Sequence, residues 1–350
     1  MSYFLTEEQQ LIRNSVREFC LDPSTRQAAS ADRKQGGFPY ESWKLVAEKG
    51  YIGAYVPEAY GGQGYDFTTY FVILEMLSKM GNPASMVMGA HDLAILPLLY
   101  WGTEEQKKKY LVPLASGKAI GCGAVTDPAG LNNYPEWGMT VAEDGDDFVI
   151  NGTKVLVTNA HAADIKIVFG KPSGSYFDTV YIVEKDMPGV ETGFNEQKIV
   201  PGKADWGTVN LKNVKVPKAN RVVDNGFGMY WFGPSFLSVC LSALTLGDTA
   251  FEKTLAFCKQ RTRYERPLVD LQAVSHRLVN MAINNEISRN LIYNAIRLWD
   301  EQRYEECYRL ACMSKVWIPE AINKNLHDAA ILHGGIGFTP QALVSMMWVS

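Results

Sequence analysis

The sequence predicts an α+β protein built from three successive regions: helical, then β, then helical. Residues 1–117 carry apolar side chains at helical spacing. Residues 118–222 are rich in β-branched side chains with short turn signals between them. Long helical patterns return over residues 223–350. We therefore expect a domain boundary at each of the two changes.

Composition narrows the class of protein. The 350 residues suffice for two or three packed layers, and a hydrophobic content of 47% is ordinary for a globular protein. The net charge of −4 argues against general binding to nucleic acid or to an anionic membrane, because both need a basic surface. No apolar run reaches the roughly 18 residues that span a bilayer, and the first residues lack a signal-peptide pattern.

Cysteine and histidine spacing predicts neither a disulfide framework nor a metal site. The six cysteines include no C-x-x-C pair, and the five histidines show no metal-ligand spacing. Scattered single cysteines suit reduced thiols, so we expect a cytoplasmic protein without a metal.

Helix signals are frequent in the first region. Capping-box patterns begin at Thr6 and at Thr103, and Pro39 and Gly50 bracket a helix between them. Glycines predict a loop over 57–64. Two largely apolar helices are expected over 67–80 and 84–99, and a lysine triplet over 107–109 is expected on a solvated helix face.

The middle region predicts several short antiparallel strands in a small barrel or sandwich. Asp144-Gly145 is expected to separate two strands, and 148–157 predicts a strand, a turn at Asn151-Gly152 and a second strand. Pro217 is expected to end the region. Further strands are expected over 165–169, 179–183 and 208–216.

The last region predicts three long helices, over 230–260, 268–303 and 305–332, with loops short enough to favour antiparallel packing. Three such helices leave one side of a bundle uncovered, so we expect an oligomer or a further segment to cover it. The apolar side chains that could contribute to the uncovered groove are Leu291, Ile292, Ile296, Leu298, Met313 and Val316.

Seven motifs occur in one order along the chain, and together they resemble the acyl-CoA dehydrogenase family of flavoproteins. They are the loop over 57–64, Gly102-Thr103-Glu104-Glu105-Gln106, Thr126-Asp127-Pro128, Asn151-Gly152-Thr153-Lys154, the segment over 183–189 with Pro188-Gly189, Arg261-Thr262-Arg263-Tyr264, and His333-Gly334-Gly335. The resemblance extends over the whole chain and implies the helical, β and helical domains predicted above.

The resemblance also implies FAD bound between the β domain and the C-terminal bundle. It places Val125 and Thr126 at the flavin ring or ribityl chain, and Leu156, Val157 and Thr158 on its other side. Hydroxyl and backbone N–H donors there stabilise the reduced ring. Without the motif context, the two threonines would be ordinary strand residues.

The far half of the cofactor is implied to lie against a neighbouring subunit. Arg261 suits bidentate recognition of phosphate, and Tyr264 and Gln272 match positions that contact the adenosine half. The turn at Gly334 and Gly335 would allow backbone to approach the diphosphate, although two glycines more often only end a helix.

The chain departs from the family pattern near the cofactor. Residues 129–133 read Ala-Gly-Leu-Asn-Asn in place of the usual Gly-Ala-Gly-Ser-Asp, which leaves Asn132 as the expected substrate contact there. Leu156 stands where an aromatic residue usually covers the flavin, and Glu265 replaces a usual glycine.

No catalytic base is identified. The family uses a Glu either in a Glu-Gly-Thr segment one helix beyond the His-Gly-Gly turn, which this sequence does not contain, or in the first long helix. Counted back from Gly247, the second position falls at about Leu237, so the resemblance implies Leu237 as a substrate contact. Ser238 stands where an Arg usually follows, and no Asp or Glu occurs between Asp224 and Asp248. Removal of a substrate α-proton needs such a carboxylate.

Four interpretations stay open: a truncated chain, one subunit of a heteromeric dehydrogenase, divergent flavin chemistry such as two-component monooxygenation, and a non-catalytic scaffold. The implied substrate is an acyl thioester of coenzyme A or of a carrier protein. Electron-transfer flavoprotein is the implied electron acceptor, and a homo-oligomer or a hetero-oligomer with a homologous subunit is expected.

Overall fold

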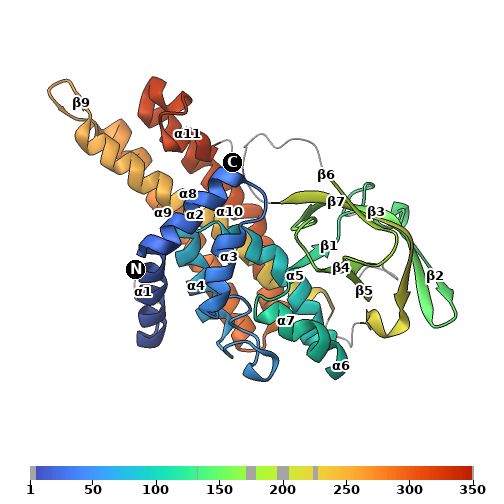
Figure 1. Ribbon diagram of the computed structural model, residues 1–350. Helices are drawn as coiled ribbons and strands as arrows, with labels where there is room; N and C mark the ends of the chain where they lie inside the picture. Colours follow the sequence, from blue (N-terminus) through green and yellow to red (C-terminus); the bar gives the residue numbers. More distant parts are fainter. Residues whose placement is uncertain (1–4, 132, 171–178, 195–204, 224–227, 349–350) are drawn as a thin grey trace.

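The computed structural model describes residues 5–131, 133–170, 179–194, 205–223 and 228–348. The chain forms a helical body with a β domain on one side, and helices from both ends of the sequence make up that body (Figure 1). The predicted order of helical, β and helical regions is confirmed.

Local capping fixes where the N-terminal helices begin. The side-chain oxygens of Thr6 and Thr103 each accept the backbone N–H of the Gln three residues later. The side chain of that Gln accepts the backbone N–H of the threonine in turn, so both predicted capping boxes are confirmed. Asp22 caps a helix that the sequence analysis did not predict. The N-terminal helices are α1 (Glu7–Leu21), α2 (Pro23–Gln35), α3 (Tyr40–Glu48), α4 (Phe67–Lys79), α5 (Ala84–Trp101), α6 (Glu104–Gln106) and α7 (Val112–Ala115).

The predicted solvated lysine face is partly correct. Residues 107–111 form a π-helical turn between α6 and α7. Lys108 and Lys109 are exposed, and Lys109 Nζ lies 2.9 Å from a carboxylate oxygen of Glu184 on the β domain.

The β domain consists of two four-stranded sheets. The first has the order β1 (Gly121–Ala124), β4 (Ile165–Phe169), β5 (Thr179–Glu184), β8 (Arg221–Val223). The second has the order β2 (Thr140–Asp144), β3 (Asp147–Thr158), β7 (Trp206–Pro217), β6 (Val190–Phe194). Strands β1, β6 and β8 were not predicted individually.

Two expectations for the β domain are wrong. Strands β1 and β4 pair in parallel, whereas the other pairs are antiparallel as expected. Asn151-Gly152 is not a turn, because β3 continues through it with only a register shift against β7. Gly152 has φ +145°, and a Cβ there would lie 2.8 Å from Met139 Cα, so the glycine serves a close backbone contact.

The C-terminal region contains the three predicted long helices, joined by tight connections. They are α8 (Phe232–Gln260), α9 (Gln272–Asp300) and α10 (Tyr304–His333). A hairpin of β9 (Thr262–Arg263) and β10 (Arg266–Pro267) links α8 to α9, and α11 (Leu343–Trp348) packs on α8 and α10.

Part of the predicted uncovered groove is present. Met313 and Val316 on α10 are 55% and 68% exposed, whereas Ile292 and Ile296 on α9 are buried within the bundle. The outward face of α9 instead exposes Val279, Ile283 and Ile287. The expected apolar surface therefore exists, but α9 contributes different residues to it because Ile292 and Ile296 lie on the face of the helix that packs into the bundle.

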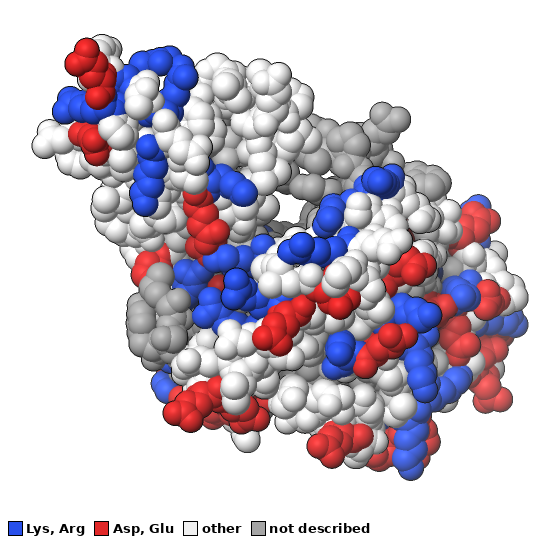
Figure 2. Space-filling model, turned by 60° about the vertical axis from the view of Figure 1, so that its left-hand side comes forward, with Lys and Arg blue, Asp and Glu red and all other residues white. Residues whose placement is uncertain are grey.

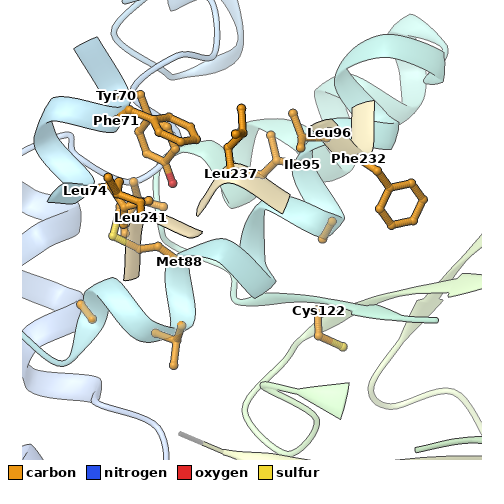
Figure 3. Close-up of a cluster of buried hydrophobic side chains, with 14 of the residues drawn as sticks. Tyr70, Phe71, Leu74, Met88, Ile95, Leu96, Cys122, Phe232, Leu237 and Leu241 are labelled. Atoms are coloured by element: carbon orange, nitrogen blue, oxygen red, sulfur yellow. The ribbon is translucent and has the colours of Figure 1, made fainter. Parts of the chain in front are cut away.

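Helix α8 is the central helix of the bundle. By length and composition it could cross a membrane, with a mean hydropathy of 1.2 over its most apolar window. It packs against α4, α5, α9 and α10, so this apolar surface forms the core of the helical body. Figure 3 shows Leu237 and Leu241 of α8 among side chains of α4 and α5.

The two helical regions are also joined by a cap. Asp300, at the end of α9, accepts the backbone N–H groups of Phe67 and Thr68 at 2.8 and 2.9 Å. A carboxylate at a helix N-terminus satisfies otherwise unpaired N–H groups and interacts favourably with the helix dipole. The start of α4 is thereby fixed by a residue more than 200 positions away.

Inside this body one carboxyl group is fully enclosed. The hydroxyls of Tyr55 and Tyr70 donate to the two oxygens of Asp92 at 2.9 and 2.6 Å. Burial raises the pKa of Asp92 to about 7, although the two tyrosine hydrogen bonds act in the opposite direction.

We predict that Asp92 makes the protein less stable as pH rises. Its folded-state pKa exceeds the unfolded value, so the favourable contribution is complete below about pH 4 and is lost as pH rises to about 7. The Asp92→Asn variant should lack this loss, which amounts to at most about 4 kcal/mol. Urea unfolding of both proteins at pH 5 and pH 8 measures the difference. Equal pH dependence in the two proteins would contradict the assignment.

Candidate functional site

A loop and a strand end of the β domain bring five of the predicted cofactor residues together. Val125 and Thr126 follow β1, and Leu156, Val157 and Thr158 end β3. The N–H of Val155 donates to the carbonyl of Thr126 at 2.8 Å, which holds the loop against the strand. The structure therefore places these five residues at one location.

A bulge in β3 turns Leu156 outward. The register with β7 shifts between Lys154 and Val157, and Leu156 has φ +55°, a left-handed conformation that costs a non-glycine residue about 1–2 kcal/mol. Its side chain is 54% exposed, whereas Val157 is buried. The bulge thus presents an apolar surface to the outside of the sheet.

Thr158 is fixed by its neighbours on two sides. The indole N–H of Trp206 on β7 donates to the Thr158 hydroxyl oxygen at 2.7 Å. The next residue, Asn159, donates from its side chain to the carbonyls of Val87 on α5 and Gly121 on β1, at 3.1 and 3.2 Å. Since the hydroxyl accepts from Trp206, its own proton is directed elsewhere and can be donated to a ligand.

Trp206 was not predicted from the sequence as a site residue. The indole is 41% exposed beside Thr158, on the strand next to the position where Leu156 replaces the usual aromatic residue. A tryptophan next to a glycine at the start of a strand was the available signal.

A buried ion pair links the loop after β1 to strand β3. Lys154 Nζ lies 3.8 Å from a carboxylate oxygen of Asp127 and 3.5 Å from the centre of the Trp137 ring. Burial lowers the pKa of Lys154 to about 8, and Asp127 counters part of that effect. The other oxygen of Asp127 accepts the N–H groups of Ala129 and Gly138. The motifs around both charged residues were recognised in the sequence, but their pairing was not.

A pocket of about 190 Å³ opens between the helical body and Thr158. It joins the β domain to one face of α5 and one face of α8. Its lining residues are Leu74, Ser85, Met86, Gly89, Ala90, Leu93, Thr158, Ser235, Ser238, Val239 and Ser242.

Serine hydroxyls in this pocket already donate to helix backbone. Ser238 donates to the carbonyl of Ser235 at 2.8 Å, Ser242 to that of Ser238 at 3.2 Å, and Ser85 to that of Asn82 at 2.8 Å. Their oxygens therefore face a ligand chiefly as acceptors. None of the described residues that line the pocket is ionisable, so this wall offers binding surface without a general base.

The structure does not bring Leu237 to the pocket. Its side chain is fully buried against α4 and α5 (Figure 3), and Ser235 occupies the pocket-facing position. Counting back from Gly247 without regard to the helical phase leads to Leu237, which lies on the core face of α8. Asn132, the other expected substrate contact, lies outside the described residues.

The remaining predicted cofactor residues gather at the opposite end of the bundle. Arg261 ends α8, Tyr264 forms the tip of the hairpin and is 85% exposed, and Gln272 begins α9. The Gly334-Gly335 turn follows α10 and is exposed, and a Cβ on either glycine would meet no atom within 4 Å.

Ring stacking holds the two halves of this second cluster together. The Phe257 ring on α8 stacks on the His333 ring on α10 with centroids 4.4 Å apart. Figure 2 shows basic and acidic side chains side by side at the projecting end of the molecule, where the hairpin lies in Figure 1. An exposed guanidinium beside a side-chain-free turn fits a phosphate group.

The two clusters lie far apart in one chain. Ser235 at the pocket and Arg261 are 26 residues apart on α8, which corresponds to about 39 Å at 1.5 Å per residue. In Figure 1 the β domain and the hairpin occupy opposite ends of the molecule. The clusters can act on one dinucleotide only if a second copy supplies one of them.

The architecture defines a class of protein: a β domain on one side of a helical body built from the N- and C-terminal regions, with a pocket where they meet. Three family models match the chain: the acyl-CoA dehydrogenase N-terminal domain over residues 6–118, the middle domain over 122–214 and the C-terminal domain over 229–350. The chain therefore belongs to the acyl-CoA dehydrogenase family of flavoprotein oxidoreductases, as the sequence motifs indicated.

Individual relatives agree with this placement. The chain is 31% identical to an acyl-CoA dehydrogenase of Bacillus subtilis over 95% of its length and 89% of the relative. It is 28% identical to CarC, a subunit of the caffeyl-CoA reductase–Etf complex of Acetobacterium woodii, over 99% and 93%. Butyryl-CoA dehydrogenase from Megasphaera elsdenii superposes with a TM-score of 0.87 at 27% identity, over 99% and 92%.

The tip of the hairpin carries backbone strain. Tyr264 and Glu265 form its two-residue loop, with φ of +52° and +61°. Such a loop favours Asn-Gly, because both positions are left-handed.

We predict that Glu265→Gly raises the free energy of unfolding by about 0.5–1 kcal/mol, since the relieved strain exceeds the added chain entropy of glycine. Glu265→Ala removes the same charge but keeps a Cβ, so it should give no gain. Thermal unfolding of both variants separates backbone strain from charge. Equal stabilisation by alanine would show that charge is the cause.

Proposed function

We propose that this chain is an FAD-dependent oxidoreductase that acts on acyl thioesters, with each FAD held between two subunits. The observation that carries the proposal is the position of Thr158. Thr158 belongs both to the group of five predicted cofactor residues in the β domain and to the wall of the largely apolar pocket. A ring held at that cluster would have its edge beside an acyl group in the pocket.

The residues fit the cofactor. Leu156, whose side chain is 54% exposed, offers apolar contact to a flat ring, and the hydroxyls of Thr126 and Thr158 offer donors to its heteroatoms. When bound, FAD supplies a two-electron acceptor for the acyl group. The second subunit would contribute Arg261 and the Gly334-Gly335 turn to the diphosphate, with Tyr264 and Gln272 toward the adenosine.

The pocket residues position the substrate. Leu74, Leu93 and Val239 line the cavity with Thr158, and such apolar walls exclude water and favour an acyl chain. The serine oxygens of α8 accept hydrogen bonds rather than protons. The described lining thus assigns this chain to binding and orientation, and the group that accepts the α-proton would come from elsewhere in the assembly.

Lack of an ionisable group in the described lining favours an oligomer in which a homologous subunit holds the base. The second candidate is a flavin-binding scaffold without turnover, which the same observation supports. The two candidates differ in one measurable outcome. Once the missing base is supplied, the enzyme would reduce its bound flavin with an acyl thioester, whereas the scaffold would not. Electron-transfer flavoprotein is the proposed electron partner, since the relative CarC is a subunit of a complex with Etf.

We predict that Arg261→Ala weakens FAD binding about tenfold or more, because it removes a charge-assisted contact to phosphate worth roughly 1.5–3 kcal/mol. Arg303→Ala is the control, since Arg303 pairs with Glu301 and Glu306. Fluorescence titration with FAD measures both. Wild-type protein that never retains flavin after refolding with excess FAD would refute the cofactor assignment.

We predict that Ser235→Glu introduces reduction of the bound flavin by saturated acyl-CoA, at least about 10²-fold faster than wild type. The substitution places a carboxylate in the pocket. Leu237→Glu instead buries a carboxylate in the core, so it should destabilise the fold without adding activity. Anaerobic loss of flavin absorbance measures the rate. Fast bleaching by the wild-type chain alone would show that its base is already present.

A further inference from the structure

A second cavity, of about 460 Å³, lies next to the pocket described above. The two share Ser85, Met86 and Ser242 in their walls. Met86 is 46% exposed, so its flexible side chain separates the two spaces without closing either one off. The cavity volume falls in the range of roughly 300–1,000 Å³ that is typical of small-molecule sites.

Most of the wall of this second cavity is apolar. Helices α5, α8 and α11 and the turn before α5 provide it. The apolar lining residues are Pro39, Met80, Pro83, Met86, Val87, Leu246, Leu343 and Met347. Such a wall suits the continuation of a hydrocarbon chain.

One wall residue carries an unpaired donor. Asn82 is 3% exposed, and its Oδ1 accepts the N–H of Ala84 at 3.0 Å, which caps α5. That bond fixes the orientation of the amide. Its Nδ2 has no hydrogen-bond partner among the described residues. A buried donor without a partner is costly, and a ligand acceptor would recover the loss.

The charges in the wall favour an anionic acceptor. Of the two basic residues in the wall, Lys79 is already paired with Glu252 at 2.8 Å, and Arg33 spends one N–H group on the carbonyl of Gly81 at 2.7 Å. The acidic residue is Asp32, and its oxygens are engaged by the N–H groups of Glu41 and Ser42 at the start of α3. The guanidinium of Arg33 keeps further donors for a carboxylate.

We propose that the acyl group bound by this chain is elongated and ends in a carboxylate: it runs from the first pocket past Met86 into the second cavity, where Asn82 and Arg33 receive the carboxylate. The inference rests on the proposed function and specifies its substrate class. It assigns Met86 as the residue that determines chain length, and Asn82 as the residue that selects the polar end.

The test compares acyl-CoA thioesters on the FAD-loaded protein by calorimetry. The probes are butyryl-CoA, hexadecanoyl-CoA and the hexadecanoyl form with a terminal carboxylate. The carboxylate form should bind about tenfold tighter than its methyl-ended match, which is the effect of one good hydrogen bond to a charged group. Asn82→Asp keeps the oxygen that caps α5 but replaces the donor, so the preference should disappear while methyl-ended binding is unchanged.

Met86→Trp tests the path between the cavities. It should weaken both long thioesters at least tenfold more than it weakens butyryl-CoA, because only the long chains must pass the bulkier side chain. Equal affinity of wild type for the two long thioesters, or unchanged binding of both by the Trp variant, would overturn the inference. Binding of butyryl-CoA alone would do so as well, while leaving the proposed function intact. No binding of any acyl-CoA would instead contradict the proposed function itself.

Discussion

The packing of α8 is the constraint on which the rest of the molecule depends. One face of this helix buries Leu237, Leu241 and Leu244 against the N-terminal helices and the bundle. The adjacent face turns Ser235, Ser238 and Ser242 toward the pocket. Because both faces belong to one rigid element, the core that stabilises the protein also sets the width of the pocket, and a change in helix rotation would alter both.

Sequence alone predicted the fold well, because local and long-range signals agreed. Capping boxes at Thr6 and Thr103 mark real helix starts, and the three long C-terminal helices follow from their apolar patterns. The sequence also grouped Thr126 with Thr158, through a resemblance rather than through periodicity. The N–H bond of Val155 to Thr126 shows the physical basis of that grouping.

The errors have specific physical causes. Leu237 was two residues from the pocket-facing Ser235, and two residues rotate the side chain by about 200° around a helix. Asn151-Gly152 looked like a hairpin turn, yet β7 pairs with β3 on both sides of it, so tertiary pairing overrode the local turn signal. The Lys154–Asp127 pair and the contact of Trp206 with Thr158 join segments distant in sequence, which no local pattern encodes.

The separation of the two cofactor clusters links binding to assembly. A ligand that contacts the strand end near Thr158 in one subunit and Arg261 in another binds only the assembled state, so each equilibrium stabilises the other. The exposed apolar residues on α9 and α10 supply surface for such an assembly independently of the cofactor. If the missing base resides on a homologous subunit, the same contact that completes the FAD site also completes the chemistry. In the proposed function, the distance of about 39 Å along α8 therefore makes assembly a condition for FAD binding rather than an addition to it.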